Sequence, residues 1–132
     1  MGSEKMVAVL IIDPDITFCQ ALSNALHKNY NIYFAHSAEE SAQICKRKNI
    51  DIAFITLGSP AHGISSLISE LRDMSPETRV IALSDDLTDH SQIAAMIRIG
   101  SLGVNQFVSN PLVHQHISKA VDDELANCVS MV

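Results

Sequence analysis

The chain has 132 residues, of which 47% are hydrophobic and 18% charged, and its formal net charge is −6. This length predicts a single domain with a sizeable core, and the apolar content excludes a disordered chain. The acidic balance disfavours a direct nucleic-acid contact, because phosphate binding requires clustered Lys and Arg. No apolar run approaches the roughly 20 residues of a membrane-spanning helix, so we expect no membrane contact.

The two ends of the chain and its cysteines indicate the compartment and the domain limits. Residues 1–6 (MGSEKM) are too polar for a signal peptide and are typical of a cloning remnant or a disordered N-terminus. We expect the domain at 7–127 and a tail at 128–132, in a piece cut from a longer protein. Cys19, Cys45 and Cys128 lie far apart in helical patterns, which predicts buried free thiols and favours the reducing cytoplasm.

The first elements are a buried strand and an amphipathic helix. Val7–Ile12 (VAVLII) is a continuous apolar run rich in β-branched residues, typical of a strand buried on both faces. Asp15 is placed to cap the helix that follows, in which apolar residues recur at helical spacing. The apolar positions of this helix are Ile16, Cys19, Leu22 and Leu26.

A second strand and a second helix come next. Asn31–Ala35 (NIYFA) is strand-like, and Ser37 with Glu40 forms a capping-box pattern that opens a helix through Cys45. The basic cluster Lys46–Lys48 falls at the end of this helix, where positive charge complements the helix dipole.

The second half of the chain repeats the alternation of strands and helices. Ile52–Ile55, Val80–Leu83 and Val104–Val108 predict three more strands, and Pro76 and Gly100 punctuate the helices between them. The helical stripes are Ile64, Leu67, Ile68 and Leu71, then Ile93, Met96 and Ile97, and finally Val113, Ile117, Val121 and Leu125.

Five apolar strands alternating with five helices predict a three-layer α/β fold, with a doubly wound parallel sheet covered by helices on both faces. In such sheets the functional crevice lies beyond the carboxyl ends of the strands. The candidate site residues at those ends are Asp13, Pro14, Asp15, Thr56, Ser84 and Asn110.

On this order of elements, and on Asp13, Ser84, Phe107 and Pro111, the chain resembles a response-regulator receiver domain from Val7 to Leu125. The resemblance implies a flavodoxin-like fold with strand order 2-1-3-4-5, which takes a phosphoryl group from a histidine kinase onto an aspartate. In that family two acids after the first strand and the acceptor aspartate after the third hold Mg²⁺. A hydroxyl after the fourth strand and a lysine after the fifth contact the acyl phosphate.

The decisive positions depart from the family pattern. Asp13 and Ser84 match, but Pro14 stands in place of the second acid, Thr56 in place of the acceptor aspartate and Asn110 in place of the lysine. A threonine hydroxyl is not ionised and needs an adjacent base to become a nucleophile. The loss of two acids also leaves Mg²⁺ too few hard oxygen ligands, so we expect no metal or other cofactor.

The structural roles that replace this chemistry can also be predicted. We expect Thr56 to end its strand with its hydroxyl bonded locally. The two weak metal candidates, Asp13 and Asp15, are expected to form a turn and a helix cap. Phe107, at the family's switch-aromatic position, is expected to be a core or edge aromatic. The resemblance implies a cis bond between Asn110 and Pro111, whereas sequence alone favours trans.

The six histidines lack the spacing of a metal site. His114 and His116 are two residues apart, which does not place them on one face of a helix. We expect His62, in the loop after the third strand, to be the only histidine near the crevice.

We interpret the chain as an atypical receiver domain without enzymatic activity, which acts by protein–protein interaction rather than by aspartyl phosphorylation. Expected partners are a histidine kinase, an output domain of the same chain, or a second copy. The family docks through the fourth helix, fifth strand and fifth helix, where Met96, Ile97 and Ile99 are the candidate exposed apolar residues.

Three alternatives stay open. One is a conventional Mg²⁺-dependent receiver in which Asp15 replaces the lost acid. Another is a small-molecule or flavin binder on the same fold, although the carboxylates of Asp13 and Asp15 repel phosphate and no glycine-rich fingerprint occurs. The third is phosphorylation of Thr56 by a hydroxyl-directed kinase, which a half-buried strand end disfavours.

Overall fold

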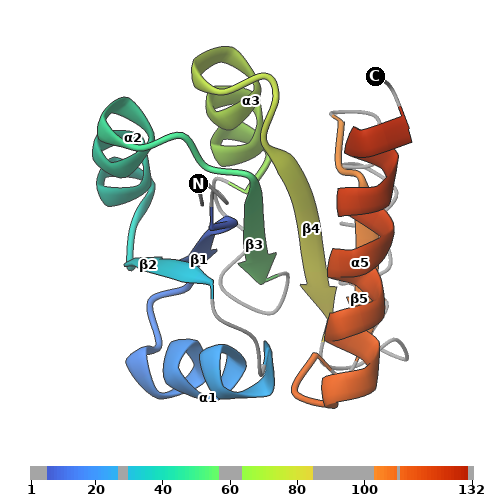
Figure 1. Ribbon diagram of the computed structural model, residues 1–132. Coiled ribbons are helices and arrows are strands. Elements are labelled where there is room, and N and C mark those ends of the chain that lie inside the picture. Colours follow the sequence, from blue (N-terminus) through green and yellow to red (C-terminus); the bar gives the residue numbers. More distant parts are fainter. Residues whose placement is uncertain (1–5, 27–29, 57–63, 85–102, 110, 131–132) are drawn as a thin grey trace.

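The computed structural model describes residues 6–26, 30–56, 64–84, 103–109 and 111–130 (Figure 1). The predicted fourth helix, with Met96, Ile97 and Ile99, lies outside the described residues, and so does the Asn110–Pro111 bond. The elements in the described part are β1 (Ala8–Ile12), α1 (Ile16–Leu26), β2 (Asn31–Ala35), α2 (Ala38–Arg47), β3 (Ile52–Thr56), α3 (Ile64–Met74), β4 (Arg79–Ser84), β5 (Gln106–Ser109) and α5 (His114–Ser130).

The five strands form one parallel sheet in the order β2-β1-β3-β4-β5, which confirms the predicted topology. The strands β2 and β5 are the two edges, and Figure 1 shows them at opposite sides of the sheet. The register pairs Ile12 with Ile55 and Thr56 with Leu83. The carboxyl ends of β1, β3 and β4 therefore finish at the same edge of the sheet.

The central strands are buried on both faces, which explains why their sequences are continuous apolar runs. Alternate residues point to opposite faces of a strand, so each strand contributes to two cores. Leu10 and Ile55 pack with α3 on one face, while Ile11 and Phe54 pack with α1 and α5 on the other. Each fully buried side chain of this size stabilises the fold by about 1.5–3 kcal/mol.

Two helix starts differ from the predicted apolar stripes. Val113 precedes α5 and is 43% exposed, so its assignment to the inward stripe was wrong, whereas Ile117 and Val121 are fully buried. Ile16 is the first residue of α1 and is 58% exposed, because the inward stripe starts one turn later, at Cys19. At its other end α5 continues to Ser130, past the domain limit expected at 127.

The caps of α2 follow the predicted box with one change. The Ser37 hydroxyl accepts the N–H of Glu40 at 3.1 Å, as expected of an N-cap. The Glu40 carboxylate accepts the N–H of His36 at 2.6 Å, one residue before the cap. Lys46 and Arg47 lie exposed in the last turn, where they complement the helix dipole.

The described part of the chain also tests the predictions of buried thiols and of no membrane-spanning helix. Cys19 is a buried free thiol, whereas Cys45 is only half-buried, and the side chain of Cys128 lies outside the described part. Among the described residues, no helix combines the length and the apolar character that a membrane span requires.

Candidate functional site

The structure places Asp13, Thr56 and Ser84 at the carboxyl edge of the sheet. Asp13 directly follows β1, and Thr56 and Ser84 are the last residues of β3 and β4. Their exposed fractions are 7%, 8% and 1% respectively, so all three are buried. Asp13 and Thr56 share one face of the sheet, because strand alternation places them on the side of Ile11 and Phe54. Asn110 lies outside the described residues.

The carboxylate of Asp13 is engaged in a turn. Its Oδ1 accepts the N–H of Asp15 at 2.7 Å, which closes an Asx turn around Pro14. The Asp13 N–H donates to the carbonyl of Ala35 at 3.0 Å. Pro14 is exposed and supplies no side-chain oxygen. This geometry confirms the predicted turn.

Asp15 caps α1, as predicted. Its Oδ1 accepts the N–H of Thr17 at 2.9 Å and that of Phe18 at 3.3 Å, while its carbonyl accepts the N–H of Cys19 at 3.1 Å. An N-cap of this kind stabilises a helix by about 1 kcal/mol. The same carboxylate oxygen is therefore not free to turn toward Asp13 without uncapping the helix.

His36 belongs to this site, which the sequence analysis missed. Its ring Nδ1 lies 3.1 Å from the carbonyl oxygen of Asp13, and the Sγ of Cys19 lies 3.6 Å from the same oxygen. The expectation that His62 would be the only histidine near the crevice was therefore wrong, and His62 itself lies outside the described residues. The strand order could have indicated this contact. β2 lies beside β1 in parallel, and His36 follows β2 as Asp13 follows β1, so the two residues lie at the same edge of the sheet.

Thr56 ends β3 as predicted, but its hydroxyl is not bonded locally within the described part of the chain. Its Oγ1 is buried and has no hydrogen-bond partner among the described residues. A buried polar group without a partner costs about 1–3 kcal/mol. The Oγ1 of Thr56 therefore destabilises the fold rather than contributing to the packing of β3.

Burial next to two acids makes Cys19 an inert thiol. Burial, and then the charges of Asp13 and Asp15, raise the pKa of Cys19 from its usual value of 9.0 to about 11. The thiol is therefore protonated at neutral pH, and it serves as a weak donor to the Asp13 carbonyl rather than as a nucleophile.

Within the described part of the chain, the donor set at this edge is poor in carboxylates. Among the described residues, no group of three His, Cys, Asp or Glu side chains is placed to hold a metal ion. At this edge Pro14 has no side-chain oxygen, Thr56 offers a neutral hydroxyl, and Oδ1 of Asp13 accepts the N–H of Asp15.

The sequence profile described as the response regulator receiver domain matches residues 9–122, which is most of the chain. The chain belongs to the response regulator receiver domain family. The hydrogenase transcriptional regulatory protein HoxA of Cupriavidus necator is 24% identical to this receiver domain over 119 residues, which are 90% of the chain and 24% of HoxA. The transcriptional regulatory protein GlrR of Escherichia coli is 25% identical over 124 residues, 93% of the chain and 27% of GlrR. The receiver domain thus spans about a quarter of the length of these relatives.

Solved structures show the same fold. A response regulator from Thermotoga maritima superimposes with a TM-score of 0.80 at 22% identity, covering 92% of this chain and 99% of that one. A receiver domain protein from Clostridium thermocellum gives 0.82 at 19% identity, covering 96% and 100%. These likenesses establish the architecture of the receiver domain.

In this receiver domain Phe107 lies on the edge strand and packs against the core, as expected of a core or edge aromatic. Phe107 pairs with Ala82 across β4 and β5, is half-buried, and packs against the core cluster that contains α3. Next to it, β5 and α5 border a groove of about 330 Å³. His116, Lys119 and Asp123 line the groove on the α5 side. We call it the β5–α5 groove.

Proposed function

We propose that this receiver domain is a signalling interaction module that does not accept phosphate from a histidine kinase and has no catalytic activity. The observation that carries the proposal is Thr56, a buried and neutral residue at the strand end where the family places its acceptor aspartate. An aspartate is ionised at neutral pH and attacks phosphohistidine directly, whereas a threonine needs a base. Asp13, at the same edge of the sheet, is a candidate base, and its Oδ1 already accepts the Asp15 N–H.

We also propose that the domain functions without Mg²⁺. This ion requires near-octahedral coordination by oxygen and is usually held by carboxylates. Asp13 contributes to a turn, Asp15 caps α1 and Pro14 has no side-chain oxygen. The described residues therefore do not fit a magnesium ion.

The residues Pro14, Thr56 and Asn110, where the family carries charged side chains, all make the crevice less charged. Two like charges about 4 Å apart repel by roughly 4 kcal/mol at an effective dielectric constant of about 20. An acid cluster at the positions of Asp13, Pro14 and Thr56 would thus be strained without a cation, whereas the residues present are not. Likewise, Asn110 removes a positive charge that would have no phosphate to contact.

Treatment with a phosphodonor tests this proposal. We expect no mass adduct after incubation with acetyl phosphate and Mg²⁺, and no amide shift localised at Asp13, Thr56 and Ser84 after addition of beryllofluoride. The matched control is the triple variant Pro14→Asp, Thr56→Asp, Asn110→Lys, which restores the family pattern and is expected to form the adduct. An adduct on the unaltered chain, mapped to this crevice, would establish the conventional alternative instead.

For a partner, we propose another signalling protein, an output domain in the same chain or a second copy, docked at the β5–α5 groove in the cytoplasm. Two relatives are named transcriptional regulatory proteins, and each is about four times as long as this domain. The groove is bordered by the edge strand β5 and by α5, and an ion pair between Lys119 and Asp123 lies along its α5 side. Charged side chains at the rim of a surface favour a partner of complementary charge.

A further inference from the structure

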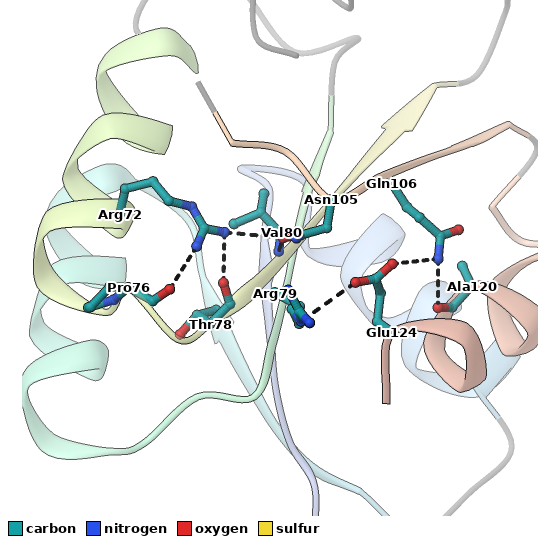
Figure 2. Close-up of polar contacts among 9 residues, drawn as sticks. All are labelled: Arg72, Pro76, Thr78, Arg79, Val80, Asn105, Gln106, Ala120 and Glu124. Atoms are coloured by element: carbon teal, nitrogen blue, oxygen red, sulfur yellow. Dashed lines mark hydrogen bonds and ion pairs between the residues drawn. The ribbon is translucent and has the colours of Figure 1, made fainter. Parts of the chain in front are cut away.

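A polar network joins four elements at the amino end of the sheet, opposite the candidate site (Figure 2). Arg72, near the end of α3, donates from Nη1 to the carbonyl of Pro76 at 3.0 Å and from Nη2 to that of Thr78 at 2.7 Å. The same Nη2 donates to Oδ1 of Asn105 at 3.3 Å, just before β5 begins. One guanidinium therefore connects α3, the α3–β4 loop and the start of β5.

Asn105 continues this connection into β4. Its Oδ1 also accepts the N–H of Val80 at 2.8 Å, and its own N–H donates to the carbonyl of Val80 at 2.8 Å. One amide oxygen thus receives hydrogen bonds from both α3 and β4. We call Arg72 and Asn105, with the groups they bind, the Arg72 bracket.

Gly103 shows how closely the chain passes over Arg72. Its φ is +101°, a conformation that glycine adopts without strain, and a Cβ built there would lie 3.3 Å from Cδ and Nε of Arg72. The backbone leading into β5 therefore rests directly on the aliphatic stem of the arginine.

The placement of Arg72 is costly, so its hydrogen bonds must compensate. Burial, and then the nearby charge of Arg79, lower the pKa of Arg72. Its Nε is buried without a partner among the described residues, and no carboxylate in that part of the chain forms an ion pair with it. Three backbone or amide oxygens hold the cation instead, and hydrogen bonds from a charged donor are stronger than those between neutral groups.

The strand that this bracket holds has little other anchorage. β5 has four residues, lies at the edge of the sheet and pairs only with β4 among the described strands, and Val108 is its one buried residue. Its first residue, Gln106, is fixed by a second polar contact: Nε2 donates to Glu124 at 2.8 Å and to the Ala120 carbonyl at 3.2 Å. Side-chain hydrogen bonds therefore determine where β5 begins.

We infer that Arg72 is a positioning residue for the β5–α5 groove, and that the last turn of α3 is conformationally coupled to this docking face through Asn105. The inference rests on the proposed function in taking the groove as the docking face. Release of the bracket would loosen β5 and change the groove, while β1, β2 and β3 keep their core packing. A partner that favours one position of β5 would therefore also stabilise the end of α3.

Amide hydrogen exchange on the whole chain tests the inference. Arg72→Lys keeps the charge but loses the planar fork that reaches three oxygens at once. We expect exchange of the 106–109 amides to accelerate at least about tenfold, with β1 and β3 unchanged. The matched control is Arg47→Lys at an exposed position of α2, which should leave all strands unchanged.

Variants of Asn105 separate coupling from general loss of stability. Asn105→Ala removes the shared acceptor, so it should accelerate exchange of the 106–109 amides as Arg72→Lys does. Asn105→Asp keeps an acceptor oxygen, so these amides should exchange as slowly as in the unaltered chain. The double variant Arg72→Lys, Asn105→Ala should be no worse than either single variant, because both break one unit. Equal acceleration in all strands, no acceleration in β5, or identical behaviour of the Ala and Asp variants would each overturn the inference. A phosphodonor adduct would refute the proposed function without changing these exchange rates.

Discussion

The hydrogen bonding of the Thr56 hydroxyl shows whether this group stabilises the end of β3. It is buried without a hydrogen-bond partner among the described residues, whereas the hydroxyl of Thr78 donates to the Ile50 carbonyl at 2.7 Å. These two buried threonines, at opposite ends of the sheet, therefore differ in what their hydroxyls contribute to stability. Substitution by valine removes the oxygen from each with little change of shape.

We expect Thr56→Val to raise the free energy of unfolding by about 1 kcal/mol, because the buried hydroxyl loses its desolvation cost. Thr78→Val is the control, and should lower that free energy by about 1–3 kcal/mol because the Ile50 carbonyl loses its donor. Urea unfolding monitored by circular dichroism measures both changes. Destabilisation by Thr56→Val would mean that its hydroxyl is hydrogen-bonded in solution.

The thiol of Cys19 predicts a dependence of stability on alkaline pH. Its pKa is about 11 in the folded chain and about 9.0 in the unfolded chain, so the unfolded chain loses this proton first. The stabilisation is complete below about pH 9 and is lost as the pH rises toward 11, with a slope of at most about 1.4 kcal/mol per pH unit. In Cys19→Ala this part of the slope should be absent. A slope unchanged by the substitution would show that another group causes it.

At the scale of the elements, the turn between β1 and α1 is held from several sides. The Asp13 carbonyl contacts the His36 ring and the Cys19 thiol, and Asp15 caps the helix that follows. In the family this loop contributes metal ligands, whereas here groups of the chain itself fix it. Asp15 is either a helix cap, as its contacts indicate, or a ligand of Mg²⁺, as in the conventional alternative.

Asp15→Ser tests which role Asp15 performs. Serine caps helices about as well as aspartate, so we expect less than about 0.5 kcal/mol of change in unfolding free energy. Asp15→Ala removes the cap and should cost about 0.5–2 kcal/mol. If Asp15 were a metal ligand, both variants would abolish a Mg²⁺-dependent stabilisation of the unaltered chain. Thermal unfolding with and without Mg²⁺ distinguishes these outcomes.

The β5–α5 groove carries its own prediction. Lys119 and Asp123 form an exposed pair at 3.0 Å along α5, and such pairs contribute little to stability. Lys119→Glu should therefore change unfolding by less than about 0.5 kcal/mol while it weakens association at this face. Solution mass measured at several protein concentrations, or pull-down of the partner, reads out the association. If the variant associates as the unaltered chain does, docking occurs elsewhere.

At the scale of the whole molecule, the sequence predicted what depends on local pattern. The runs AVLII, IAFIT and RVIALS are buried on both faces, so their strands could be recognised without neighbours. The sheet order followed from the family resemblance. Contacts between segments far apart in sequence could not be predicted, such as His36 with Asp13 or Arg72 with Asn105, because composition does not report which side chains meet.

Two buried polar residues illustrate the same limit. Glu124 is 3% exposed on a face of α5 that the helical stripe marks as apolar, because Arg79 and Gln106 from neighbouring strands meet its carboxylate. Ser41 is fully buried in α2 and donates to the Ala38 carbonyl at 2.7 Å. The polarity of Glu and Ser assigns such residues to the surface, because a single sequence does not show which hydrogen-bond partners other elements contribute.

The crevice itself is a property of three strands together, so its residues should act as a set. Thr56→Asp alone should destabilise the chain by about 1–3 kcal/mol, because it buries a carboxylate beside Asp13 with no cation. Mg²⁺ should not reverse that loss, since Pro14 still supplies no ligand. The triple variant Pro14→Asp, Thr56→Asp, Asn110→Lys should instead become more stable as Mg²⁺ is added, by about 2.7 kcal/mol at about 100 times its dissociation constant. Calorimetry across a Mg²⁺ series measures this non-additivity, and a full Mg²⁺ response in the single variant would show that the site had lost only its acceptor.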